Sequence, residues 1–119
     1  MNDHDGDDGY ATAEAAVALP ALLVVLALAI GVLVSVGDQL RCVDAARVGA
    51  RVASRGDGDG AAAEAARRAA PAGAQVRITH RGDQVEVTVT DDVRPFGPAL
   101  RMLPSVAVGA RATAQVEAP

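Results

Sequence analysis

One uninterrupted apolar run, from Ala15 to Gly37, constrains this sequence more than any other feature. It reads AAVALPALLVVLALAIGVLVSVG and carries no charge, with Ser35 as its only polar side chain. At about 1.5 Å per residue, a helix over this run reaches about 34 Å, which is enough to cross the hydrocarbon core of a bilayer. A buried core helix is the alternative, but a chain of 119 residues has too little sequence left to surround such a helix. We therefore expect a single-pass membrane helix, with Pro20 producing a mild kink near its start.

The helical pattern continues beyond the apolar run, over residues 38–55. This stretch contains no proline, and its arginines recur at the i, i+4 spacing of one helix face: Arg47, Arg51 and Arg55. Small residues also recur at every fourth position: Ala45, Gly49 and Ala53. Such a stripe lets a second backbone approach closely, and that backbone could belong to the same domain or to another subunit.

We expect residues 56–119 to form a small α+β domain. Alternating glycines and aspartates should end the long helix, and the alanine-rich stretch from Ala61 to Ala70 predicts a short second helix. Three later runs alternate apolar and polar residues with a period of two, which predicts antiparallel strands, with Arg81-Gly82-Asp83 as a hairpin turn. The proline-containing segment 91–104 should be a loop. The predicted fold class is α+β, with a long N-terminal transmembrane helix continuing into an amphipathic helix, then a short helix and a small three-stranded antiparallel sheet.

The residue pattern argues against several classes of function. The net charge is −4, and the first eight residues hold four aspartates and no basic residue, which disfavours nucleic acid as a partner. The sequence shows no catalytic Ser, His and Asp set, no metal-ligand spacing and no phosphate loop, so we expect no enzyme, no cofactor, no metal and no small-molecule substrate. His80 should be a solvated strand end, and Cys42 a buried thiol, with intermolecular pairing as its alternative. All eleven basic residues are arginine, an actinobacterial-like composition typical of a GC-rich genome.

The block Gly9-Tyr10-Ala11-Thr12-Ala13-Glu14 stands between an acidic leader, residues 1–9, and the apolar run. A carboxylate that enters hydrocarbon costs about 2 to 3 kcal/mol or more, so it should be paired or functional there. In the headgroup zone it would instead suit the positive end of the helix dipole. Taken alone, Glu14 leaves both interpretations open.

The spacing of this block resembles the processing site of type IV prepilins, in which a leader ends in Gly and Glu stands fifth in the mature chain. Gly9 and Glu14 fit that register, with Tyr10 as the first mature residue. Together with Leu19-Pro20, the block resembles the opening of TadE-like pilus assembly proteins, specifically over residues 9–36 and more loosely to about Arg55. The resemblance implies a minor pilin or pilus assembly component of a bacterial tight-adherence pilus.

The resemblance also implies roles for single residues and partners. A prepilin peptidase would cut between Gly9 and Tyr10, where a glycine just before the helix leaves the bond unhindered. Glu14 would be the assembly carboxylate, and would meet the amine of Tyr10 on a neighbouring subunit. The partners implied are the lipid bilayer, other pilin or pilus assembly subunits and, transiently, the peptidase. The segments are the leader 1–9, a pilin-like segment 10–37, the helical extension 38–55 and the domain 56–119.

We expect the chain in the cell membrane with its C-terminal domain extracytoplasmic. The acidic leader and the arginines beyond the apolar run oppose the positive-inside rule. Either a basic stretch precedes Met1, or translocation is directed by other means, or the topology is inverted, and we favour the first two. The alternatives are a small secreted protein with an N-terminal signal peptide, which would lack the usual basic n-region, and an accessory subunit of a membrane complex.

Overall fold

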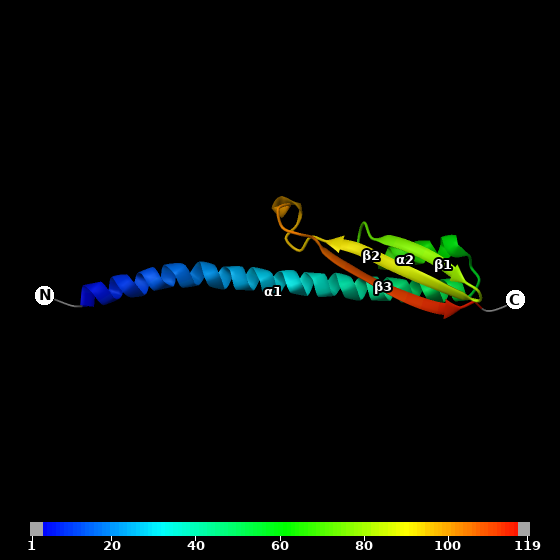
Figure 1. Cartoon of the computed structure of the whole chain (residues 1–119), viewed down its shortest axis with the longest axis horizontal. Helices are drawn as coiled ribbons and strands as arrows, with labels where there is room; N and C mark the ends of the chain where they lie inside the picture. The colour runs from blue at the N-terminus through cyan, green and yellow to red at the C-terminus, as the bar shows by residue number, and fades with distance from the viewer. Residues whose placement is uncertain (1–3, 117–119) are drawn as a thin grey trace.

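The computed structural model describes residues 4–116, so residues 1–3 of the predicted leader and residues 117–119 of the predicted domain lie outside it. The elements are, in chain order, helix α1 (His4–Ser54), helix α2 (Asp59–Ala69), strands β1 (Gln75–Arg81) and β2 (Gln84–Val93), the short 3-10 helix η1 (Pro98–Leu100) and strand β3 (Val106–Gln115). The molecule is elongated, with extents of 93 × 22 × 19 Å, because α1 projects far beyond the small domain (Figure 1). The predicted α+β class is confirmed.

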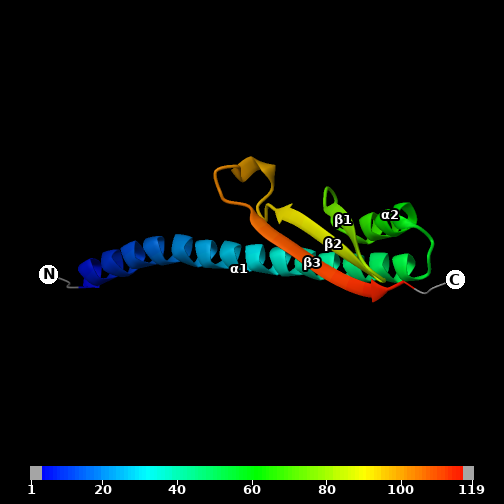
Figure 2. The same cartoon turned by 45° about the vertical axis from the view of Figure 1, so that its right-hand side comes forward.

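Helix α1 is one element of 51 residues that continues through Pro20 and past the end of the apolar run. It curves gently in its N-terminal half and shows no sharp kink (Figure 2). It also begins earlier than predicted, since Gly9 lies inside the helix and not before it. Asp7 and Asp8 lie in the first turns, where carboxylates favour the positive end of the helix dipole, and this offsets the poor helix propensity of glycine.

The three strands form one antiparallel sheet in the order β1-β2-β3. Arg81 pairs with Gln84, so Gly82 and Asp83 form the predicted two-residue hairpin turn, with Gly82 at a φ of 63°. Strand β2 runs to Val93, which pairs with Val106, so the prediction of a loop from residue 91 is wrong by three positions. Aspartates are poor strand formers, but pairing with β3 extends the ladder through them.

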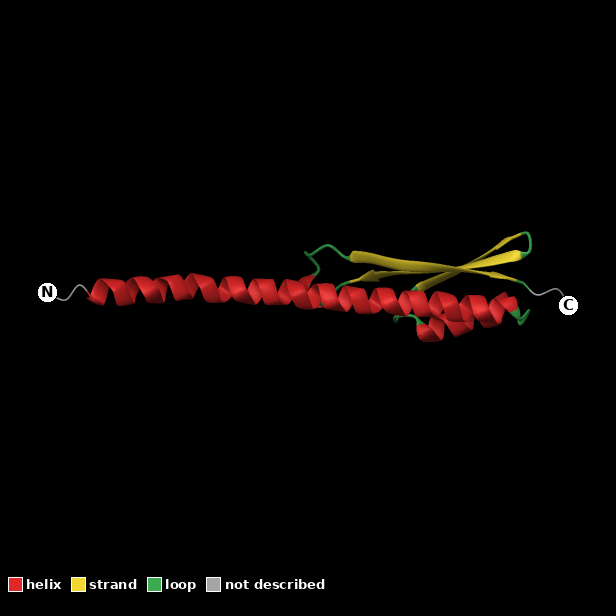
Figure 3. Cartoon of the chain, turned by 90° about the horizontal axis from the view of Figure 1, so that it is seen from below, coloured by secondary structure: helices red, strands yellow, loops and turns green. Residues whose placement is uncertain are grey.

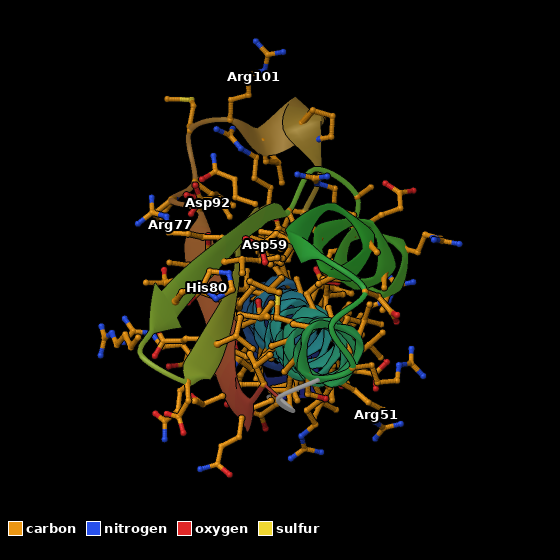
Figure 4. All side chains as sticks on the ribbon, turned by 90° about the vertical axis from the view of Figure 1, so that its right-hand side faces the viewer. Arg51, Asp59, Arg77, His80, Asp92 and Arg101 are labelled. Carbon is orange, nitrogen blue, oxygen red and sulfur yellow. The ribbon has the colours of Figure 1, made fainter. Side chains whose placement is uncertain are left out.

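The core lies between the sheet and the distal half of α1. Figure 4, viewed along the long axis, shows α1 and α2 side by side on one face of the sheet. Alternate residues of the central strand point into this space, and they meet small side chains from both helices. The buried set comprises Val85, Val87, Val89 and Val93 of β2, Cys42, Ala45, Ala46, Ala50 and Ala53 of α1, and Ala62 and Ala66 of α2. With no aromatic side chain, the core is thin and depends on close approach of backbones.

The stripe of Ala45, Gly49 and Ala53 packs within this domain, which decides between the two possible partners. A Cβ atom added at Gly49 would lie 3.1 Å from the Cβ of Ala66 and 3.0 Å from Cγ1 of Val87. A residue without a side chain lets α1 pass this close to α2 and β2 without displacing either element. The stripe is therefore part of the domain core, and a second subunit is not needed to account for it.

Strand β3 is an edge strand, and Gln39 of α1 bonds to its backbone. The Gln39 side-chain Nε2 donates to the carbonyl oxygen of Gly109 at 2.7 Å, and its Oε1 accepts from the Gly109 N–H at 2.8 Å. The side-chain amide thus replaces a missing strand neighbour at this position. This contact fixes the domain to α1 just beyond the apolar run.

Candidate functional site

The candidate processing residues, Gly9 and Tyr10, lie on the exposed surface of α1. The Tyr10 side chain is 77% exposed, and a Cβ atom added at Gly9 would contact nothing within 4 Å. The bond between them is helical, so the folded helix does not present it in the extended form that a protease needs. A protease would have to unwind the first turns of α1 to reach it.

Tyr10 and Glu14 lie one turn apart on the same face of α1, because residues at i and i+4 are neighbours on a helix. They share a shallow hollow with small and apolar side chains of the next two turns, namely Ala13, Val17, Ala18 and Ala21. Within residues 4–116 Glu14 takes part in no ion pair. This face, which we call the Tyr10–Glu14 face, therefore presents a carboxylate beside apolar surface without any counterion from the described chain.

The chemistry of such a face is that of an ion-pairing site. If a second helix covers it, the carboxylate loses water, and a charge in a dry place needs an opposite charge and hydrogen-bond donors. A primary amine supplies both.

The N-terminal half of α1 is uncovered. Figure 3 shows the strands and α2 running alongside the distal half of α1 only. The large apolar residues of the proximal half are half or more exposed, among them Val17 (74%), Leu22 (64%), Leu23 (66%) and Val25 (62%). Only 6% of the most apolar window is buried, whereas a soluble protein covers most of its core helix. Helix α1 is long and apolar enough to cross a membrane, and its bare surface is compatible with a membrane anchor.

His80 has a partner that the sequence did not reveal. Its Nε2 lies 2.8 and 2.9 Å from the two carboxylate oxygens of Asp59, the first residue of α2. Both side chains are about half exposed, at 52% and 56%, so this is a surface pair across the α2–β1 contact. The described residues include no group of three or more His, Cys, Asp or Glu side chains that could hold a metal ion.

Cys42 is fully buried and free, as predicted for a structural thiol. Burial raises the pKa of its thiol, and the nearby carboxylates of Asp91 and Asp38 raise it further. A thiol with a raised pKa holds little thiolate near neutral pH and reacts slowly. Disulfide pairing with another chain would require the domain core to open.

Fold and surface together define a class of protein, a small α+β domain carried on a long N-terminal helix whose first half is bare and apolar. Within that class the chain belongs to the family of a Mycobacterium tuberculosis (strain ATCC 25618 / H37Rv) protein named apoptosis inhibitor Rv3655c. The two are 38% identical over 104 residues, which cover 87% of this chain and 77% of that protein. No family model matches the chain, and no solved structure matches it.

Proposed function

We propose that this chain is a minor pilin or pilus assembly component of a bacterial tight-adherence, type IV-like pilus. In this proposal α1 crosses the cell membrane once, and the domain lies on the extracytoplasmic side. The partners are the bilayer, other pilin or pilus assembly subunits and, transiently, a prepilin peptidase. The proposal includes no catalytic activity, cofactor or small-molecule substrate.

The observation that carries the proposal is the Tyr10–Glu14 face. The resemblance of residues 9–36 to TadE-like proteins selects Gly9, Tyr10 and Glu14 by spacing, and the structure has Tyr10 and Glu14 on one exposed face beside small side chains. Cutting after Gly9 would create an amine at Tyr10. Within the described part of its own chain Glu14 has no counterion, and the Tyr10 amine of a neighbouring subunit would provide one.

Processing is compatible with the helical state of the Gly9–Tyr10 bond. The bond lies within the first two turns of α1, which begins at His4, and helix ends fray at low cost. Gly9 lowers that cost further, because glycine is about 1 kcal/mol less favourable than alanine in a helix. No neighbouring atom lies within 4 Å of a Cβ position at Gly9, so the bond is accessible once the turn opens.

The processing claim is tested by mass spectrometry of the membrane fraction from cells with an active prepilin peptidase. We expect a mature N-terminus at Tyr10, and cleavage should be lost in a Gly9→Val variant, whose β-branched side chain hinders the extended bond. An intact N-terminus in wild-type cells would remove processing from the proposal.

The assembly claim is tested with Glu14→Ala against Glu64→Ala as a matched control. Glu64 is an exposed carboxylate on α2 whose contact with Arg68 is long, at 3.8 Å, so the control removes a similar charge from the domain surface. We expect Glu14→Ala to remain in the membrane but to be depleted from sheared pili, and Glu64→Ala to behave as wild type. Normal incorporation of Glu14→Ala would contradict the pairing role.

The name of the mycobacterial relative favours a second candidate function, inhibition of apoptosis. We combine it with the alternative of a secreted chain, in which the domain is released from the membrane. Cutting after Val36 would leave Gln39 and the whole domain core on one fragment, so the domain could be released with its core residues intact. A fragment beginning at Gly37 in the culture medium would support this candidate. A chain found only in membrane and pilus fractions would support the first.

A further inference from the structure

The loop that joins β2 to β3, residues 94–105, is the most apolar exposed segment of the domain. It reads RPFGPALRMLPS and holds the only Phe of the chain and no acidic residue. Three of its apolar residues are exposed, Met102 by 99%, Leu100 by 51% and Leu103 by 46%. Single exposed apolar residues are ordinary, but a contiguous group on one loop marks a surface that binds something apolar.

The loop is seated on the apolar half of α1. A Cβ atom added at Gly31 would lie 2.9 Å from Cζ of Phe96 and 3.4 Å from the Cβ of Pro95, so the ring packs directly on the helix backbone. Gly31 precedes Gly37, the end of the apolar run, by about 9 Å along the helix axis at 1.5 Å per residue. Figure 1 shows the loop standing out sideways from α1 at this level.

Beside the contact of Phe96 with Gly31, an apolar groove of about 680 Å³ lies between the loop and α1. Its walls include Leu28, Val32 and Val36 of α1, and Phe96, Leu103 and Pro104 of the loop. Its size and apolar walls suit an acyl chain.

The charges of the loop complement a phospholipid headgroup. Arg94 precedes the apolar residues of the loop, Arg101 lies among them, and both are exposed. Figure 4 shows Arg101 at the far end of the loop, pointing away from the helices. A guanidinium group binds phosphate through two parallel hydrogen bonds, and Arg keeps its apolar stem in the membrane boundary while its head stays in the polar layer.

We propose that the loop 94–105 is a second membrane contact, which lies in the headgroup and upper acyl region of the leaflet facing the domain. The occupant of its groove is the acyl chain of a phospholipid, and Arg101 binds lipid phosphate. The inference rests on the proposed membrane anchoring of α1. Two contacts, helix and loop, then fix both the height of the domain above the membrane and its rotation about the α1 axis.

The test uses the full chain in vesicles of phosphatidylcholine and phosphatidylglycerol, with an environment-sensitive fluorophore on a Met102→Cys variant. Met102 is almost fully exposed, so the label leaves the core untouched, and native Cys42 is buried. Wild-type protein treated with the same reagent measures any background from Cys42. A lipid carrying a nitroxide near the glycerol end of its acyl chain should quench the Met102 label by about twofold or more, as expected for a group at the headgroup–acyl boundary.

Two matched labels separate the possible failures. Asp83→Cys, in the exposed β1–β2 turn, should not be quenched. Val24→Cys, in the apolar run, should be quenched by a nitroxide placed deeper in the acyl chain. Quenching at Val24 without quenching at Met102 overturns the loop contact and leaves the anchor standing, whereas no quenching at either site overturns the anchor as well.

Two further readouts address the occupant of the groove. The lipid proposal is wrong, and a second copy occupies the loop, if two results occur together. The Met102 label is shielded from water without being quenched by lipid, and this shielding is lost when the protein is diluted within the vesicles. Raising the phosphatidylglycerol content should increase quenching of the wild-type loop label, and an Arg101→Gln substitution should remove this increase. An unchanged response in Arg101→Gln would overturn the phosphate contact.

Discussion

The close passage of α1 against α2 and β2 at Gly49 predicts an unusual response to a glycine-to-alanine substitution. In most helix interiors this change stabilises a protein by up to about 1 kcal/mol, because alanine is the better helix former. At Gly49 the new methyl group would lie 3.0 Å from Cγ1 of Val87, 3.1 Å from the Cβ of Ala66 and 3.3 Å from the carbonyl oxygen of Ala62. These three neighbours belong to two different elements, so no single side chain can move aside.

The expected magnitude follows from two opposed terms. Overpacking a well-packed core costs about 1 to 3 kcal/mol. Subtracting the gain in helix propensity, we expect Gly49→Ala to lower the free energy of unfolding of the domain by up to about 2 kcal/mol. The matched control is Gly60→Ala, in the exposed first turn of α2, where an added Cβ would meet nothing within 4 Å. That variant should be as stable as wild type or more stable.

The buried thiol of Cys42 provides the assay. It is the only cysteine of the chain and belongs to the same core cluster as Ala66 and Val87. Its rate of reaction with a thiol reagent, measured in mild detergent across a urea series, reports how often the domain core opens. Gly49→Ala should unfold at lower urea than Gly60→Ala. Equal midpoints, or a higher midpoint for Gly49→Ala, would refute the claim that backbone approach at Gly49 limits the core.

Three other predictions concern single contacts of the domain. Gln39→Ala removes both hydrogen bonds to Gly109, should cost about 1 to 3 kcal/mol, and should speed hydrogen exchange of the Gly109 amide. Because the pKa of Cys42 is raised in the folded domain, the contribution of this thiol to the free energy of unfolding should be constant below the unfolded thiol pKa of about 8.5 and fall as the pH rises above it. Denaturant titration across this range should show the fall in wild type and not in Cys42→Ala. His80→Ala and Asp59→Asn should each change the free energy of unfolding by less than about 1 kcal/mol, since their pair is half exposed, and a larger loss in denaturant titration would contradict this.

The elements that the sequence predicts well are those set by local pattern. The apolar run from Ala15 to Gly37, the three alternating runs and the Gly82-Asp83 turn each carry their own period or turn chemistry, and all appear in the structure. Two predicted boundaries are wrong, the start of α1 and the end of β2, and both errors have the same cause. Gly9 and Asp91 are poor formers of the elements that contain them, and the neighbouring turns or strand pairing override that local preference.

The contacts of the candidate site and of the loop also differ in how far the sequence predicts them. That Tyr10 and Glu14 share one face follows from helical spacing, so a sequence is enough to predict it. The contacts of Phe96 with Gly31 and of Gln39 with Gly109 join residues far apart in the chain, 70 positions in the second case. No period or motif indicates such a pairing, since it depends on how the sheet docks along α1. Gly31 itself is only a weak signal, because glycine is frequent in membrane helices whether or not a side chain packs on it.

Helix α1 is one continuous element, but its two halves are stabilised by different partners. From Gln39 onward it is held by hydrogen bonds and by the core around Cys42, whereas before Gly31 nothing in the described domain covers it. In the proposed function, lipid or other subunits cover the proximal half, and that cover supplies the counterion of Glu14. A substitution before Gly31 should leave Cys42 protection unchanged while altering assembly, and a core substitution after Gln39 should reduce that protection. A Glu14 variant that lost both would be misfolded, and its missing pili would then say nothing about pairing.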